Sequence, residues 1–268
     1  MAYTKHSRHY LTYPLTLGER LYSIFIGPIL VVLALFLFVT YFPTTNAIFP
    51  KISFFELTLA TLYTLGRLFV AYVLALVCAI PLAILATENS LAEKILLPMF
   101  DILESIPVLA FFPVLIIFFI TLGVPEGAAI FILFISMLWN IVFTVVGGLK
   151  IIPQDIKYAS KVFKITGLKY VFKVMLPAIF PEIVTGSILA LAQGWNIIIV
   201  AEVIHTYMPL GTHAQDLFGI GSILVNASAT GNTHLFIACL AVMMVAIALF
   251  NYFVWQKLIH YSERFKFE

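Results

Sequence analysis

The sequence predicts an all-α polytopic membrane protein with about six transmembrane helices. Of its 268 residues 62% are hydrophobic and 10% are charged, and the mean hydropathy is +1.08. Soluble globular domains have roughly 45–50% apolar and about 25% charged residues. The charged residues also leave six long runs free, at 21–50, 68–87, 105–125, 127–149, 183–201 and 217–256. A hydrocarbon core about 30 Å thick needs roughly 20 apolar helical residues, so most of these runs can cross a membrane once.

Each expected span follows from one of these runs. In chain order the spans are 22–42, 57–86, 107–122, 127–149, 184–204 and 235–255. The last run is too long for one helix, and its first half is rich in Gly, Ser, Asn and Thr. Irregular backbone is tolerated at membrane depth only where protein or water covers it. The segment 207–234 is therefore expected to be an external loop or a re-entrant segment.

The basic residues determine the expected orientation. With a cytoplasmic N-terminus, thirteen of the fifteen Lys and Arg residues lie on the cytoplasmic side, Lys51 lies outside and Arg67 lies within the second span. Cytoplasmic loops carry an excess of Lys and Arg, so both termini are expected in the cytoplasm. The N-terminus does not resemble a removable signal peptide. The net charge of +2 gives no reason to expect nucleic acid as a partner.

The expected organisation is one membrane domain, 22–256, between a cytoplasmic N-terminal segment, 1–21, and a cytoplasmic tail, 257–268. The largest polar interruption is the cytoplasmic loop 150–182. Pro153 and Asp155 predict a helix start in this loop. An apolar face and a basic stripe follow at helical spacing: Ile156, Ala159 and Phe163 form the face, and Lys157, Lys161 and Lys164 the stripe. A second helical piece is expected over 168–176. A basic amphipathic helix also suits anionic lipid headgroups, so this pattern alone leaves lipid binding open.

The stretch 158–177 resembles the cytoplasmic loop of ABC importer permeases. The signature of that loop is Glu-Ala-Ala, a Gly three residues further on, and Leu-Pro after about twenty residues. The sequence keeps Ala159, Leu176, Pro177, Pro181 and Gly186. It departs from the signature with Tyr158 for Glu, Ser160 for the second Ala and Lys164 for Gly, while Gly167 comes three residues late. The stretches 104–113 and 193–202 are similar to segments of nitrate, sulfonate and taurine permeases.

The resemblance implies a type I ABC importer permease (MetI-like) fold and a non-enzymatic transport subunit. Such a subunit forms the path for a small solute, here of the nitrate, bicarbonate, sulfonate or taurine class, and couples to a cytoplasmic ATPase through 154–176. The implied coupling residues are Ile156, Lys157, Tyr158, Ala159, Ser160, Lys161, Phe163, Lys164 and Gly167. The implied partners are two ATPase subunits, a second permease half, an extracytoplasmic solute-binding protein and membrane lipid, in the plasma membrane of a prokaryote.

The irregular signature bears on the second permease half. A symmetric homodimer needs two fully competent loops, whereas two different halves relax that demand. A non-identical partner with a more regular signature is therefore expected, although a homodimer with a matching ATPase groove remains the alternative. The chain lacks a Gly-x-x-x-x-Gly-Lys-Ser/Thr phosphate loop, so no cofactor is expected in it, and ATP and Mg²⁺ are expected on the partner ATPase.

Five residues are candidates for the translocation path: Arg67, Gln193, Trp195, Asn196 and Glu202. A charge at mid-depth costs at least about 2.5 kcal/mol, so Arg67 should face a partner or water, unless it snorkels to the outer surface. Trp195 and Glu202 are nearly two helical turns apart and share a face of the fifth span. Asn196 also suits an interhelical hydrogen bond, Trp195 an interfacial position and Glu202 a wet external one.

The remaining features favour no other chemistry. His205, His213 and Asp216 fit no metal signature and are expected in a solvated loop, so no metal site is predicted. Cys78 and Cys239 lie in apolar runs and suggest no disulfide. An ion-coupled secondary transporter would be expected to carry several intramembrane ionisable groups, and only Arg67 and Glu202 qualify. That class and a non-catalytic membrane assembly subunit are the alternatives.

Overall fold

The computed structural model describes residues 54–87, 89–207 and 215–265. They all belong to one compact unit of the chain, Thr44–Glu268. Their secondary structure is entirely helical, as the composition predicts. The first predicted span, 22–42, lies outside the described residues, and so do the predicted N-terminal segment and the prediction for His213.

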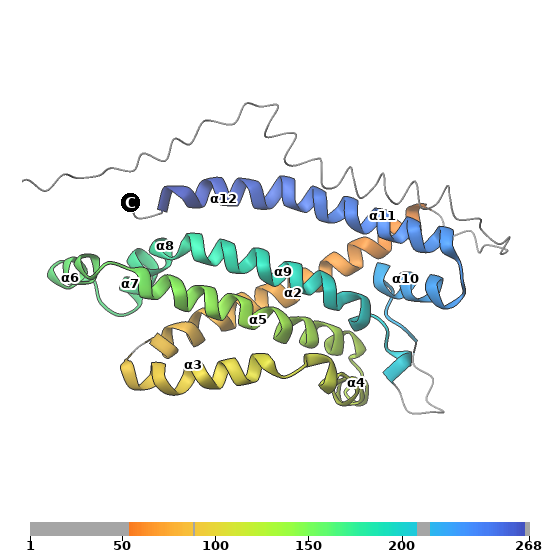
Figure 1. Ribbon diagram of the computed structural model, residues 1–268, viewed down its shortest axis with the longest axis horizontal. Helices are drawn as coiled ribbons and strands as arrows, with labels where there is room; N and C mark the ends of the chain where they lie inside the picture. Colours follow the sequence, from red (N-terminus) through yellow and green to blue (C-terminus); the bar gives the residue numbers. More distant parts are fainter. Residues whose placement is uncertain (1–53, 88, 208–214, 266–268) are drawn as a thin grey trace, which may run out of the picture. The chain divides into compact units, whose positions relative to one another are not determined.

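Figure 1 shows the order of the helices along the chain. They are α2 (Phe54–Thr87), α3 (Ser90–Ser105), η1 (Val108–Phe111), α4 (Phe112–Thr121), α5 (Pro125–Ile151), α6 (Gln154–Val162), α7 (Leu168–Tyr170), η2 (Val171–Met175), α8 (Leu176–Ala178), α9 (Phe180–Ala201), η3 (His205–Tyr207), α10 (Ile220–Ala229), α11 (Thr233–Phe250), η4 (Asn251–Trp255), α12 (Gln256–Ser262) and η5 (Glu263–Phe265). The elements η1, η3 and η5 are 3₁₀ helices, whereas η2 and η4 are π-helical turns.

Four of the described helical segments are long and apolar enough to cross a membrane: Phe55–Thr87, Pro125–Ile151, Phe180–Ala201 and Thr233–Phe265. They correspond to the predicted spans 57–86, 127–149, 184–204 and 235–255. The last one continues beyond 256, so most of the predicted cytoplasmic tail is helical. The chain is thus a multi-pass membrane protein. The predicted total of six spans depends on 22–42, which lies outside the described residues.

The third predicted span is wrong in form. Instead of one helix over 107–122, the structure has α3 followed by the segment Val108–Thr121, bent by 71° at the break between them. Pro107 precedes η1 and lacks a backbone N–H, which favours a break at this position. The charged residues of α3, such as Glu93 and Asp101, lower its hydropathy, so the sequence pattern did not predict α3 as part of a span. The two pieces form either one broken span, which would bring the described spans to five, or a re-entrant loop.

The core of the described unit is a close packing of α5 against α2 and α9. Ala71, Ala75, Ala79 and Ala83 of α2 recur at four-residue spacing and are fully buried. Small residues let helix backbones approach closely in a membrane, which explains this column. On α9, a Cβ atom added to Gly194 would lie 2.0 Å from Cε of Met137 on α5. The end of the Met137 side chain therefore fills the space beside Gly194, and a larger residue there would have to displace it.

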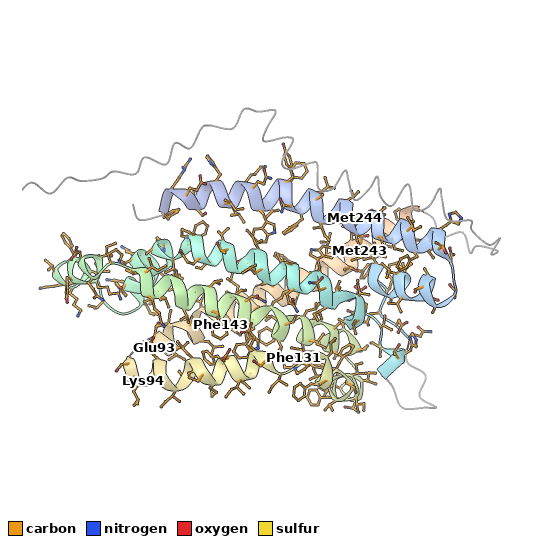
Figure 2. The ribbon with its side chains drawn as sticks, in the orientation of Figure 1. Glu93, Lys94, Phe131, Phe143, Met243 and Met244 are labelled. Carbon is orange, nitrogen blue, oxygen red and sulfur yellow. The ribbon has the colours of Figure 1, made fainter. Side chains whose placement is uncertain are left out.

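The two ends of α5 define two ends of the bundle. Its 27 residues make a helix about 40 Å long. At the C-terminal end of α5, Lys150 Nζ lies 2.6 Å from Oε1 of Glu93 on α3, and Figure 2 labels Glu93. The helix α6 begins three residues after α5 ends. At the N-terminal end, Glu126 reaches α2. We call these the α6 end and the α10 end, because α10 also contacts α2 and α9 there.

Candidate functional sites

The first candidate site is the loop at the α6 end. As predicted, a short helix begins just after Pro153 and has Asp155 in its first turn. The helix ends where Lys164 adopts a left-handed conformation with φ of 55°, and Ile165 N donates to the carbonyl of Ser160 at 2.8 Å. Lys164 stands at the signature's Gly position. The left-handed turn gives a physical reason for glycine there, since a Cβ atom disfavours that conformation.

The outward face of α6 carries large apolar side chains next to the exposed Asp155 of its first turn. Tyr158, Val162 and Phe163 are 61%, 77% and 75% exposed. Ala159 is exposed on the same side. The expectation that Ile156 shares this face is wrong, because Ile156 is half-buried and packs against the core. Phe163 follows the last residue of α6, so helical spacing does not fix the direction of its side chain.

Several predicted coupling residues of the loop instead face a groove. Ser160 is only 6% exposed, and its hydroxyl donates to the carbonyl of Lys157 at 2.8 Å. Lys157 and Lys161 line a groove of about 440 Å³ between α6 and the start of α7. The other lining residues are Gln154, Tyr158, Ser160, Ile165, Thr166, Gly167 and Tyr170. No described carboxylate forms an ion pair with either lysine. Burial raises the pKa of Tyr170, so its hydroxyl stays neutral.

The second candidate site is a buried arginine at the α10 end. Arg67 of α2 is 4% exposed, so the alternative that it snorkels to the surface is wrong. Its Nε and Nη2 atoms donate to the two carboxylate oxygens of Glu126 at 2.5 and 2.8 Å. Its Nη1 atom donates to Oε1 of Glu202 at 2.7 Å and to the carbonyl of Phe218 at 3.0 Å. Arg67 thus joins α2 to α5 and to the chain on both sides of the loop between α9 and α10.

Glu202 is the centre of the buried part of this network. Its side chain is fully buried, so the alternative of a wet external position is wrong. Besides Arg67, the hydroxyl of Thr64 donates to Oε1 at 2.6 Å and Gly221 N donates to Oε2 at 2.8 Å. A Cβ atom on Gly219 would lie 2.3 Å from the carboxylate. The backbone before α10 therefore packs directly on Glu202, and the predicted re-entrant segment contains a helix anchored to the bundle.

The structure separates the other predicted path residues from this network. Trp195 is nearly buried and lines an apolar cavity of about 250 Å³ with residues of α2 and the C-terminal helices. Asn196 is exposed and Gln193 is half-buried. Sequence reasoning missed Glu126 altogether. Its only sequence signal is that it is the single charge between two long charge-free runs.

The described part of the loop between α9 and α10 holds a contact between His205 and Asp216. His205 Nδ1 lies 2.7 Å from Oδ2 of Asp216, and the backbone N–H groups of Ile204 and His205 donate to Oδ1 at 2.9 and 3.0 Å. Within the described residues, no three His, Cys, Asp or Glu side chains group as metal ligands.

Comparison with known families identifies this architecture. The family model for the binding-protein-dependent transport system inner membrane component matches residues 79–259, which is more than half of the chain. The chain belongs to this family. It is 32% identical over 186 residues to the nitrate import permease protein NrtB of Leptolyngbya laminosa, covering 69% of this chain and 62% of that protein. It is 35% identical over 144 residues to the bicarbonate transport system permease protein CmpB of a Synechocystis species, covering 54% of this chain and 50% of that protein.

The fold of this binding-protein-dependent transport component matches a solved structure of the MetNI methionine ABC transporter in an inward-facing conformation. The TM-score is 0.66 at 19% identity, over 80% of this chain and 99% of that chain. The predicted MetI-like permease fold and the resemblance to the nitrate permease class are therefore confirmed. The chain spans only half to about two thirds of the length of the sequence relatives named above. The family match includes the α6 loop, whereas Arg67 lies before it.

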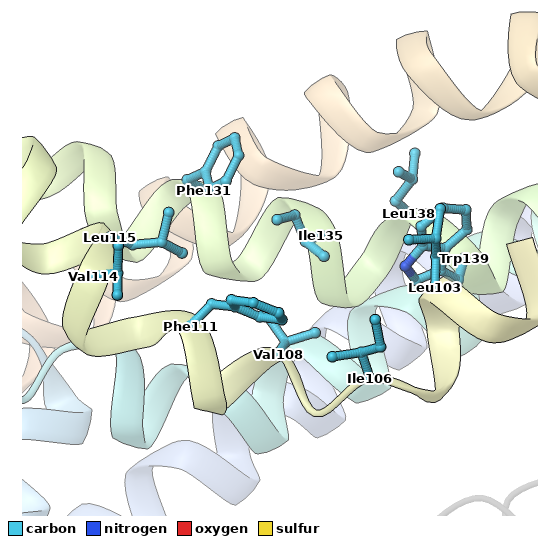
Figure 3. Close-up of a pocket in the computed structure, with 10 residues that line it drawn as sticks. All are labelled: Leu103, Ile106, Val108, Phe111, Val114, Leu115, Phe131, Ile135, Leu138 and Trp139. Carbon is cyan, nitrogen blue, oxygen red and sulfur yellow. The ribbon is translucent and has the colours of Figure 1, made fainter.

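This transport component also has an apolar cavity of about 380 Å³ between α3, α4 and α5 (Figure 3). Leu103, Phe111, Phe131 and Trp139 are among its lining residues. The Nε1 atom of Trp139 is buried and has no hydrogen-bond partner among the described residues. All the lining side chains are apolar or aromatic. The cavity therefore has no charged side chain, and the Nε1–H group of Trp139 is its one polar side-chain group among the lining residues.

Proposed function

We propose that this chain is the permease subunit of an ATP-driven importer and that α6 is its contact with a separate ATPase. The observation that carries this proposal is the outward apolar face of α6, formed by Tyr158, Ala159, Val162 and Phe163. Large apolar side chains that remain exposed outside the spans suit a protein partner, and lysines beside them suit its acidic rim. ATP and Mg²⁺ bind the ATPase in this proposal, and this chain holds no cofactor.

The proposed assembly sits in the plasma membrane of a prokaryote, with the α6 end and both termini in the cytoplasm. Two ATPase subunits dock there, and a solute-binding protein delivers the solute at the α10 end. The relatives named for nitrate import and bicarbonate transport support a small oxyanion as the solute. The exposed stripe of α9, which contains Thr185, Leu189, Ala192 and Asn196, offers a partly polar surface for the path, with Gln193 beside it.

The second permease half is proposed to be a different chain. Lys164 adopts a left-handed conformation that costs more for lysine than for glycine. This loop is therefore less stable than one with the signature's glycine at that position. A partner with a regular signature would transmit most of the motion and relax the demand on this loop. The mass of the intact complex tests this point, since two copies of this chain with full transport and no other permease contradict it.

The α6 contact is tested by co-purification of the ATPase with Val162→Asp and Phe163→Asp variants. A carboxylate buried in an interface without a partner costs several kcal/mol, so both variants should lose most of the bound ATPase. The matched control is Ser90→Asp, because Ser90 is exposed at the start of α3 at the same end of the bundle and an acid is favourable there. Unchanged ATPase content in both α6 variants would favour the lipid-headgroup role of this helix.

The mode of energisation is tested by uptake of labelled nitrate or bicarbonate into proteoliposomes that hold the purified complex. Uptake should require ATP hydrolysis on the side of the vesicle membrane where the ATPase subunits lie. It should persist when ionophores collapse the ion gradients. Uptake that follows an ion gradient without ATP would instead indicate a secondary transporter.

A further inference from the structure

We propose that Arg67 is a binding residue for the transported oxyanion, and that the Glu126 carboxylate occupies the place of that anion until it arrives. The inference rests on the proposed import function for the identity of the solute. It begins with the two edges of the guanidinium. The Nη1 edge is held by Glu202 and the Phe218 carbonyl, while the Nε and Nη2 edge is held by both oxygens of Glu126. The second edge is the fork that binds carboxylates and other planar oxyanions with two parallel hydrogen bonds.

The two carboxylates on Arg67 differ in how firmly they are held. Glu202 is fully buried and accepts further hydrogen bonds from Thr64 and Gly221. Moving it would leave these donors unpaired in the interior. The Glu126 side chain is 46% exposed, and Arg67 is its only hydrogen-bond partner among the described residues. Glu126 can therefore turn into water without stranding another group, whereas Glu202 cannot.

An exchange at Arg67 keeps one anionic group on its Nε and Nη2 edge. Nitrate and bicarbonate carry one negative charge and present two oxygens on one side of a planar group, as the Glu126 carboxylate does. When such an anion takes the Nε and Nη2 edge, Arg67 keeps a paired charge and Glu126 becomes solvated. Simple loss of Glu126 would instead leave part of the guanidinium unpaired, which is costly for a buried charge.

The position of Arg67 suits an early step of entry. It lies in the network at the α10 end, beside the first turn of α5. In the proposed orientation this is the outer end, where a solute-binding protein releases its ligand. The backbone of 218–221 covers the Glu202 side of the guanidinium, and Glu126 covers the other side. The half-exposed Glu126 is therefore the only described carboxylate whose departure opens the fork of Arg67.

The test is anion-dependent unfolding of the purified full-length chain carrying Glu126→Ala. We expect the unfolding temperature of this variant to rise saturably, by several degrees, in sodium nitrate or bicarbonate relative to sodium chloride at equal ionic strength. Sodium acetate, which replaces the missing carboxylate, should act likewise. The wild type should show a much smaller rise, because Glu126 already occupies the fork. The double variant Arg67→Gln, Glu126→Ala should show none.

The inference is wrong if the folded Glu126→Ala variant gives no oxyanion-specific rise, or if the double variant gives the same rise. Should Glu126→Ala fail to fold, Glu126→Gln keeps the side-chain shape while removing the competing charge. In the assembled complex Glu126→Gln should then lower the nitrate or bicarbonate concentration for half-maximal uptake several-fold, and an unchanged or higher value would overturn the inference. The unfolding measurement uses the chain without the ATPase. A failure of ATP-driven uptake by the wild type would therefore refute the proposed function, while the unfolding result would still show whether Arg67 binds an oxyanion.

Discussion

Replacing Glu202 by alanine should strongly destabilise the chain. The change removes the oxygens that accept from Thr64 at 2.6 Å, from Arg67 at 2.7 Å and from Gly221 N at 2.8 Å. Each buried donor left without an acceptor costs about 1–3 kcal/mol, and breaking a buried ion pair by removing one partner costs about 3–5 kcal/mol. Because Glu126 still pairs with Arg67, the loss is expected to stay near the ion-pair figure of about 3–5 kcal/mol rather than the sum.

The measurement is the free energy of unfolding in mixed micelles, obtained by titrating a denaturing detergent and following helicity. Glu202→Gln should cost less, about 1–3 kcal/mol, because the amide keeps the shape and one acceptor. The matched control is Glu93→Ala. Its partner Lys150 is also close, at 2.6 Å, but the two side chains are 43% and 45% exposed. Such a pair contributes about 0–1 kcal/mol. If Glu202→Ala cost no more than Glu93→Ala, the network would not stabilise the fold.

Three further predictions concern the loop, the core and the orientation. Lys164→Gly should stabilise the chain by about 0.5–1 kcal/mol, because it relieves a left-handed residue at φ of 55° but adds freedom to the unfolded state, and the same unfolding assay would show it. Gly194→Ala should cost about 1–3 kcal/mol, since its new methyl group would displace the end of the Met137 side chain, whereas a neutral result would mean that this flexible side chain moves aside without loss. In a variant without native cysteines, an impermeant thiol reagent added to intact cells should label Thr230→Cys and spare Thr166→Cys, and the reverse pattern would invert the orientation.

The sequence predicts the elements whose signals are local. The helix α6 was expected from Pro153 and from the spacing of its apolar residues, and it forms at Gln154–Val162. The four long spans follow from charge-free runs, because burial in lipid requires many consecutive apolar residues. The bent pair of α3 and α4 was missed in part, since the charges of α3 make its hydropathy resemble that of a loop.

The network at the α10 end shows why contacts between helices could not be predicted from the sequence. Arg67 and Glu202 were singled out separately as costly intramembrane charges. Their contact joins residues 135 positions apart, and the contact with Glu126 joins residues 59 apart. Periodicity reports which face a residue occupies on its own helix, but the choice of partner depends on how three helices pack. Likewise, the inward direction of Ile156 depends on the bundle beneath α6 and not on the pattern within it.

The helix α5 connects the two candidate sites mechanically. It runs without a break for 27 residues, from the turn that holds Glu126 to the turn that holds Lys150, and its buried side chains pack on both α2 and α9. A close-packed helix transmits displacement as a rigid body, because its neighbours resist compression. In the proposed importer, a push on α6 therefore reaches Glu126 about 40 Å away as a shift of the whole helix. Arg67 belongs to α2, so such a shift would act directly on the contact between Glu126 and Arg67 and would couple the ATPase to the anion site.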